Sequence, residues 1–107
     1  MNENYLIVLE KSETGFSAYS PDVPGCIATG ENLEETTEQM RSALALHLAD
    51  IKDLPKPRGI DAYLEALSDS EGKIFYLTHV LVESIIANYQ QEMLTLWQEK
   101  LFIFDKY

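Results

Sequence analysis

The sixteen residues Ser20-Pro-Asp-Val-Pro-Gly-Cys-Ile-Ala-Thr-Gly-Glu-Asn-Leu-Glu-Glu35 carry the clearest structural signal in this chain. Pro21 and Pro24 each fix the backbone angle φ and lack a hydrogen-bond donor. Pro24 and Gly25 suit the two central positions of a type II turn, of which the second requires a positive φ. Because Cys26 to Thr29 then form a short apolar run, the stretch predicts a tight corner that leads into a new strand.

A helix is predicted to begin directly after this strand. Asn32, followed three residues later by Glu35, is a variant of the capping box that starts helices. The acidic residues that follow suit the positive end of a helix dipole, and apolar residues then recur at spacings of three and four. The helix is expected to run from Leu33 to about Asp50, with an apolar stripe of Leu33, Met40, Ala43, Leu44, His47 and Ile51.

Strand patterns lie on both sides of this helix. Tyr5 to Leu9 is an unbroken apolar run, typical of a central strand that is covered on both faces. Phe16 to Ser20 alternates as a strand with one packed face does, and with the strand near residues 26–30 these segments are expected to form an antiparallel meander. Lys73 to Val82 is mostly apolar on both faces, which predicts a further strand that is covered on both sides.

The segment between the helix and the last strand begins with two prolines. Pro55 and Pro57 end the helical pattern and predict an extended linker from Leu54 to Arg58. A short helix capped by Asp61 is then expected over Asp61 to Leu67, followed by a turn at Ser68 to Gly72.

The C-terminal residues 83–107 are predicted to add a helix of about four turns and an apolar tail. The tail runs Leu-Phe-Ile-Phe from residue 101, and an exposed patch of this kind marks an interface. We expect this segment to belong to the same compact unit as residues 1–82 and to mediate formation of a homodimer or larger oligomer. Burial against the chain's own core is the alternative. The candidate oligomer interface is Trp97, Leu101, Phe102 and Phe104.

Length and charge bound the possible functions. A chain of 107 residues is expected to form one domain. Its formal net charge is −10, and residues 1–50 contain nine acidic residues against Lys11 and Arg41 alone. This balance disfavours binding to nucleic acid and favours a basic partner, although negative charge also serves solubility. The candidate acidic partner-binding surface is Glu31, Glu34 and Glu38, all at the predicted helix start.

No pattern in the chain points to catalysis, a metal or a cofactor. His47 and His79 are each interpreted as packed residues, because neither has a second His, a Cys or a Ser at a spacing that implies a metal site or triad. The carboxylates that lie four residues apart at the helix start could bind a hard cation, but acids are expected there on electrostatic grounds alone. The corner residues Pro21, Asp22, Pro24, Gly25 and Cys26 are therefore interpreted as scaffold.

Cysteine content and hydropathy bear on localisation. Cys26 is the only cysteine, so an intrachain disulfide is impossible, and it is interpreted as a small buried apolar residue. The sequence has no basic region before an apolar N-terminal run and no apolar stretch of the ~20 residues that span a bilayer. The expected location is the cytoplasm, without membrane contact.

Residues 5–50 resemble the HicB family of antitoxins from toxin–antitoxin systems. The shared pattern is an apolar strand, a strand led by Gly15, the Pro-Asp-apolar-Pro-Gly-Cys corner at Pro21 to Cys26, then Thr29-Gly30 and a Glu-rich helix start. Asn32 stands where the family usually has Ser or Thr, and Thr36 where it usually has Ala. Residues 59–82 also fit the family's later half, though more loosely.

This resemblance implies an α+β fold, a partial ribonuclease-H-like β-β-β-α-β core over residues 1–82 with an extra C-terminal helix. It also implies a non-catalytic protein, without cofactor, that binds and neutralises a small basic HicA-type mRNA-cleaving ribonuclease toxin. Many relatives carry a C-terminal DNA-binding module, but residues 83–107 are too short for one, so DNA binding is not expected. The alternatives are an orphan homo-oligomeric relative without a toxin and a metal-dependent nuclease.

Overall fold

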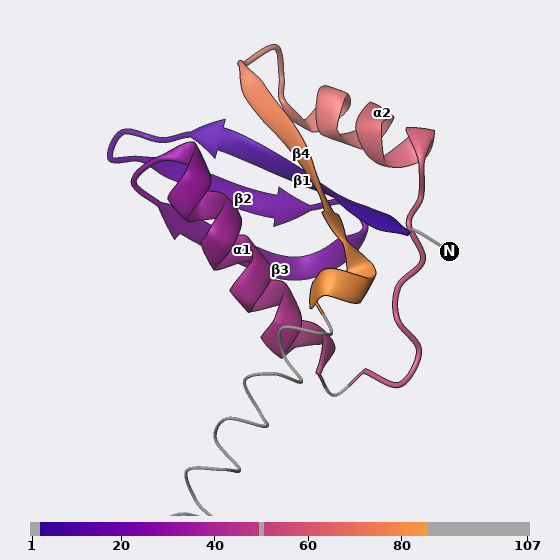
Figure 1. Ribbon diagram of the computed structural model, residues 1–107. Coiled ribbons are helices and arrows are strands. Elements are labelled where there is room, and N and C mark those ends of the chain that lie inside the picture. The colour runs from indigo at the N-terminus through magenta and orange to yellow at the C-terminus, as the bar shows by residue number, and fades with distance from the viewer. Residues whose placement is uncertain (1–2, 50, 86–107) are drawn as a thin grey trace, which may run out of the picture.

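A computed structural model describes residues 3–49 and 51–85 of the chain. These residues form a four-stranded antiparallel sheet with the strand order β3-β2-β1-β4 and two helices (Figure 1). In chain order the elements are β1 (Asn4–Lys11), β2 (Phe16–Ser20), β3 (Val23–Gly30), α1 (Leu33–Leu48), α2 (Ile60–Asp69) and β4 (Phe75–Leu81). Residues 82–85 are again helical, and the rest of the predicted C-terminal helix and tail lies outside the described residues.

The sheet topology confirms the predicted antiparallel meander and makes β1 an interior strand. β1 pairs with β2 on one side, with Leu9 opposite Ala18, and with β4 on the other, with Ile7 opposite Thr78. Tyr5 to Leu9 are all buried, as their unbroken apolar run predicted. The fold is therefore a mixed α/β arrangement, and its description as ribonuclease-H-like stays a prediction.

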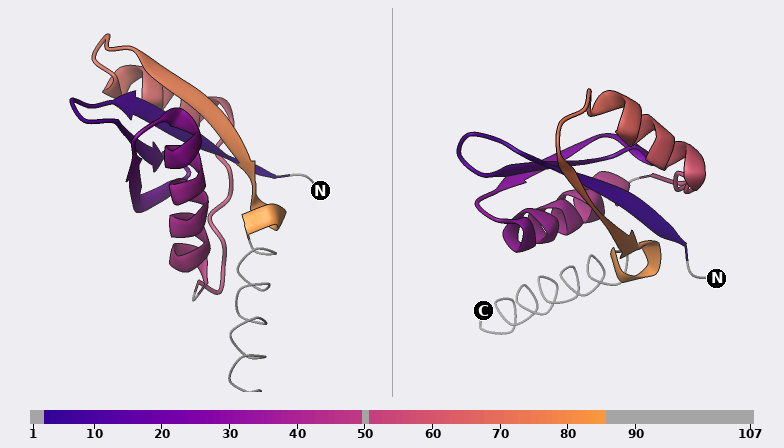
Figure 2. Two further views of the ribbon diagram at one scale, coloured as in Figure 1. Left: turned by 60° about the vertical axis from the view of Figure 1, so that its left-hand side comes forward. Right: turned by 90° about the horizontal axis from the view of Figure 1, so that it is seen from above.

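The two helices cover opposite faces of the sheet (Figure 2). Residues alternate along β1, so Tyr5, Ile7 and Leu9 face the main core beneath α1, whereas Leu6 and Val8 face α2. On the α2 side the helix contributes only Ala62 and Ala66 to the buried cluster. Side chains this small allow a helix to lie close against a sheet, but they bury little apolar area.

The last strand lies at the edge of the sheet, which corrects the prediction that it is covered on both sides. β4 pairs only with β1 among the described residues, and Tyr76, Leu77 and Leu81 are exposed. Its apolar sequence predicted burial on both faces, but the order of strands leaves it with one neighbour. Of its seven residues, Val80 alone is fully buried.

The corner after β2 is also arranged differently from the prediction. The chain reverses at Pro21 and Asp22, because Ser20 pairs with Val23 and β3 has already begun at Val23. The next pair is Tyr19 with Ile27, so residues 24–26 form an irregular insertion inside β3. The expected positive φ at Gly25 is confirmed, at +87°.

Two details of the predicted helices are wrong. On α1 the buried positions are Thr36, Met40, Leu44, Ala45 and Leu48; His47 is exposed rather than packed in the core. The second helix begins at Ile60 with Gly59 as its N-cap, so Asp61 lies in the first turn and does not cap it. The backbone of Gly59, at φ +62°, starts this helix by accepting a hydrogen bond from the Ala62 N–H at 3.1 Å.

Within the described residues, no helix combines the length and the apolar character that crossing a membrane requires.

Candidate functional site

The carboxylate of Asp22 is the centre of the corner. The side chain is 4% exposed, and its two oxygens accept backbone hydrogen bonds from the N–H of Leu6 and the N–H of Arg58, each at 2.8 Å. Its own N–H donates to Ser20 Oγ at 3.2 Å. The corner therefore joins the β2–β3 turn to β1 and to the linker before α2.

Arg58 extends this connection to α2. Its Nη1 donates to the carbonyl of Pro21 at 3.2 Å and to Glu65 Oε2 at 2.9 Å. The Arg58–Glu65 ion pair is partly exposed, so it stabilises the fold modestly, by roughly 0.2–1 kcal/mol. Its main effect is geometric, because it fixes the orientation of α2 relative to the corner.

Of the remaining corner residues, two are buried and two are exposed. Pro21 and Cys26 are buried, whereas Pro24 and Gly25 are exposed. Burial raises the pKa of the Cys26 thiol, so at neutral pH the residue is a neutral thiol and a poor nucleophile. Cys26 packs in the main core, as its interpretation as a small apolar residue required.

Three side-chain groups with raised pKa values make the stability of the fold depend on pH in the alkaline range. Burial is the main cause of a raised pKa at Tyr5, Tyr19 and Cys26, and nearby carboxylates raise the pKa of the two tyrosines further. The Tyr5 hydroxyl donates to the carbonyl of Pro55 at 2.8 Å and so holds the linker against the sheet. Because the folded chain holds these protons more tightly than the unfolded chain does, they stabilise the fold. This stabilisation is complete below the unfolded-state pKa of each group and is lost as the pH rises through its folded-state pKa.

We therefore expect the free energy of unfolding to fall above about pH 9. Urea unfolding of the wild type and of Tyr5→Phe, followed by circular dichroism from neutral to alkaline pH, measures how much Tyr5 contributes to this loss of unfolding free energy. The difference between the two proteins should narrow as pH rises, because the wild type alone loses the tyrosine hydroxyl proton. A difference that stays constant or widens would contradict this assignment.

The start of α1 confirms the predicted cap. Asn32 Oδ1 accepts a hydrogen bond from the Glu35 N–H at 2.7 Å, and Glu35 Oε2 accepts from the Glu31 N–H at 3.2 Å. Glu31, Glu34 and Glu38 are all exposed. This end of α1 thus presents a concentrated negative charge, with Leu33, 36% exposed, beside it.

A different surface combines charge with apolar area, and the sequence analysis missed it. Ile60, Leu64 and Leu67 project from the outer side of α2 and are 70%, 57% and 62% exposed. We call these three residues the α2 stripe. Their spacing of four and three is the available sequence signal, but Ala62 and Ala66 have the same helical periodicity on the opposite side. The sequence alone therefore does not show which side faces the sheet.

Two hollows flank α2. One, of about 450 Å³, lies between the linker, the start of β1 and β4, and includes Lys56, Tyr63 and His79 in its lining. The other, of about 370 Å³, lies beside the corner and is bordered by Glu65 and Asp69 of α2. Because a hollow runs along each side of the helix, α2 stands as a ridge on this face of the molecule.

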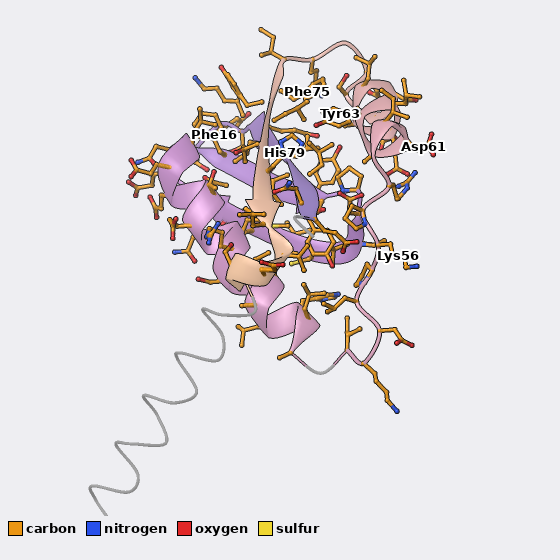
Figure 3. The ribbon with its side chains drawn as sticks, turned by 45° about the vertical axis from the view of Figure 1, so that its right-hand side comes forward. Phe16, Lys56, Asp61, Tyr63, Phe75 and His79 are labelled. Atoms are coloured by element: carbon orange, nitrogen blue, oxygen red, sulfur yellow. The ribbon has the colours of Figure 1, made fainter. Side chains whose placement is uncertain are left out.

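Tyr63 connects this ridge to the edge strand. Its hydroxyl is hydrogen-bonded to Nε2 of His79 on β4, and Figure 3 shows the tyrosine reaching from α2 toward that strand. His79 is exposed rather than packed in a core, which corrects its interpretation from the sequence. Among residues 3–49 and 51–85, no group of three or more His, Cys, Asp or Glu side chains could hold a metal ion.

Comparison with known sequences identifies a family. The model that describes a HicB-like antitoxin of bacterial toxin–antitoxin systems matches residues 5–107. An uncharacterised 14.9 kDa protein in the rep-hol intergenic region of Haemophilus phage HP1 is 35% identical over 83 residues, which cover 74% of this chain and 60% of that protein. A UPF0150 protein of Helicobacter pylori is 36% identical over 45 residues, covering 42% of this chain and 62% of that protein. The chain thus matches about three fifths of each relative's length.

Comparison with solved structures gives the same result. The crystal structure of the antitoxin HicB3 matches with a TM-score of 0.57 and 26% identity, over 72% of this chain and 60% of that chain. A chain in the HicA3 and HicB3 toxin–antitoxin complex matches with a TM-score of 0.55 and 26% identity, over 69% of this chain and 93% of that chain. The candidate oligomer residues Trp97, Leu101, Phe102 and Phe104 lie outside the described residues.

Proposed function

The chain belongs to the HicB-like antitoxin family of bacterial toxin–antitoxin systems, and we propose that it is a non-catalytic protein that binds and neutralises a small basic HicA-type ribonuclease toxin. The observation that carries this proposal is the family match over residues 5–107. A similar structure contains the HicA3–HicB3 complex, so toxin binding occurs in a structural relative.

The charge distribution supports a basic partner. The chain has a net charge of −10, and the exposed acids Glu31, Glu34 and Glu38 gather at the start of α1. A concentrated charge of one sign accelerates association with a partner of opposite sign, in a manner that salt suppresses. We assign to this acidic surface the role of steering a basic toxin toward the protein.

Growth rescue tests the proposed function. The proposal predicts that a small basic HicA-type protein is encoded beside this chain. That protein should arrest bacterial growth when it is produced alone, and co-production of the chain should restore growth. Continued arrest, at matched soluble levels of both proteins, would contradict the proposal.

Charge reversal tests the steering role within the same system. Changing Glu31, Glu34 and Glu38 together to Lys should slow association by about tenfold at low salt and less at high salt. A variant with the same charge change at the exposed residues Glu13, Asp53 and Glu83 is the matched control. Equal slowing in both variants would assign the effect to net charge rather than to the α1 surface.

We also propose that residues 83–107 mediate self-association and that the chain does not bind DNA. This segment contributes Trp97 and the Leu-Phe-Ile-Phe run from residue 101, but only two lysines, Lys100 and Lys106. Apolar content of this kind suits a protein interface, and a contact with phosphates requires more basic residues.

A further inference from the structure

The α2 stripe is an apolar surface that the packing of the described chain does not use. Helix α2 already buries Ala62 and Ala66 against β1, yet Ile60, Leu64 and Leu67 stay more than half exposed on its outer side. Single exposed apolar residues are ordinary on protein surfaces, but a contiguous group marks an interaction site. Three aliphatic side chains within two turns of one helix form such a group.

The charges around the stripe favour one kind of occupant. Helix α2 carries Asp61, Glu65 and Asp69 and contains no basic residue. Glu65 is paired with Arg58, but Asp61 and Asp69 have no basic residue beside them on the helix. Two copies of the chain that packed stripe against stripe would therefore bring like charges together, and like charges opposed at an interface cost affinity. A basic partner with an apolar patch gains from both the stripe and its acidic border.

We propose that the α2 stripe is the contact surface for the basic toxin, with Ile60, Leu64 and Leu67 as its apolar centre. This inference rests on the toxin-binding function proposed above and adds where the toxin docks. Interfaces derive most of their binding energy from a few desolvated apolar or aromatic residues, whereas charges at the rim act mainly on association rate. Helix α1 covers the opposite face of the sheet (Figure 2), so the acids at its start are not part of this contact.

The helix is held ready for such a contact. Arg58 joins α2 to the corner through Glu65, and Tyr63 joins it to β4 through His79. Its three apolar side chains are 57–70% exposed, so a partner can reach them. A surface that is already ordered costs less conformational entropy on binding.

The test is a serine substitution on α2 with a matched substitution on α1. Leu64→Ser should weaken binding of the purified full chain to the basic protein encoded beside it by at least about tenfold, and Leu64→Ser with Leu67→Ser by about 100-fold. Leu46→Ser is the control, because Leu46 is 70% exposed but lies on α1, across the sheet. It should change the affinity by less than about twofold.

Kinetics separate docking from steering. The α2 variants should act mainly by raising the dissociation rate in surface plasmon resonance, whereas the α1 charge reversals should act mainly by lowering the association rate. Unchanged affinity of the α2 double variant, beside a wild type that binds, would overturn the docking site and leave the proposed function intact. A wild type that does not bind would overturn both.

Measurements on the protein without toxin test whether the stripe is instead covered by the chain's own C-terminal segment or by a second copy. If the stripe is free until the toxin binds, Leu64→Ser should have the solution mass of the wild type, and its melting temperature should fall no further than that of Leu46→Ser, which has the same loss of helix propensity. A fall several degrees larger than that of Leu46→Ser would assign the stripe to the chain's own C-terminal segment, and a lowered mass would assign it to a second copy. Either result would contradict the inference.

Discussion

Replacing Asp22 with alanine is expected to lower the free energy of unfolding by about 3 kcal/mol. The carboxylate accepts hydrogen bonds from the backbone N–H groups of Leu6 and Arg58, each at 2.8 Å, and the first of these bonds is fully buried. Alanine leaves both donors without this acceptor, and an unsatisfied buried donor costs about 1–3 kcal/mol. The loss exceeds the gain from no longer burying a charge, because the two backbone donors stay in place.

Urea unfolding followed by far-ultraviolet circular dichroism measures this effect. Asp22→Asn should fall between the wild type and Asp22→Ala, because its amide keeps one acceptor oxygen while its NH₂ faces a donor. Asp53→Ala is the matched control at an exposed position and should change the free energy by less than about 0.5 kcal/mol. If Asp22→Ala were as stable as this control, Asp22 would not be the structural centre of the corner.

Gly30→Ala is the second substitution with a large expected cost, again about 3 kcal/mol. A Cβ at residue 30 would lie 2.5 Å from Thr36 Oγ1, 2.7 Å from Thr36 N and 2.9 Å from Thr36 Cα. Thr36 is fully buried and its N–H bonds to the Asn32 carbonyl in the first turn of α1. The added methyl group therefore has to displace the backbone at the helix start.

Gly25→Ala separates this clash from the cost of backbone strain. Gly25 has φ +87°, but a Cβ there would meet only His47 Cε1, at 3.9 Å. Its expected cost is about 1 kcal/mol, from the left-handed conformation alone. Equal effects at positions 25 and 30, measured by the same unfolding experiment, would contradict the close approach of β3 to α1.

The parts of the fold that follow from local patterns could be predicted from the sequence. The Asn32–Glu35 cap, the buried run from Tyr5 to Leu9 and the positive φ of Gly25 each depend on residues close together in the chain, and each is signalled directly by the sequence. The family resemblance rests on the same local patterns. It added the antiparallel order in which the last strand lies beside the first.

The errors arose where exposure depends on neighbours distant in sequence. β4 is apolar on both faces, but it has one strand neighbour among the described residues. His47 fits the helical spacing of the core residues, yet the buried side of α1 includes Met40, Leu44 and Leu48 and leaves His47 exposed. Periodicity gives the angle of a side chain around its helix, and the tertiary fold decides which angle is buried.

The α2 surface was missed for the same reason. Leu64 and Ala66 lie on opposite sides of one short helix, and the sequence favours the larger side chain as the buried one. The structure buries the alanine instead, because Asp22 and Arg58 hold the linker and helix close to β1. The corner thus helps to determine which side chains α2 exposes.

Calorimetric titration of the purified full chain with the purified basic protein encoded beside it is the decisive measurement. An antitoxin of this family should bind with a dissociation constant in the nanomolar range. The complex should elute as one species in size-exclusion chromatography and should lack ribonuclease activity. Absence of binding heat at micromolar concentrations, with ribonuclease activity unchanged by the chain, would contradict the toxin-neutralising function.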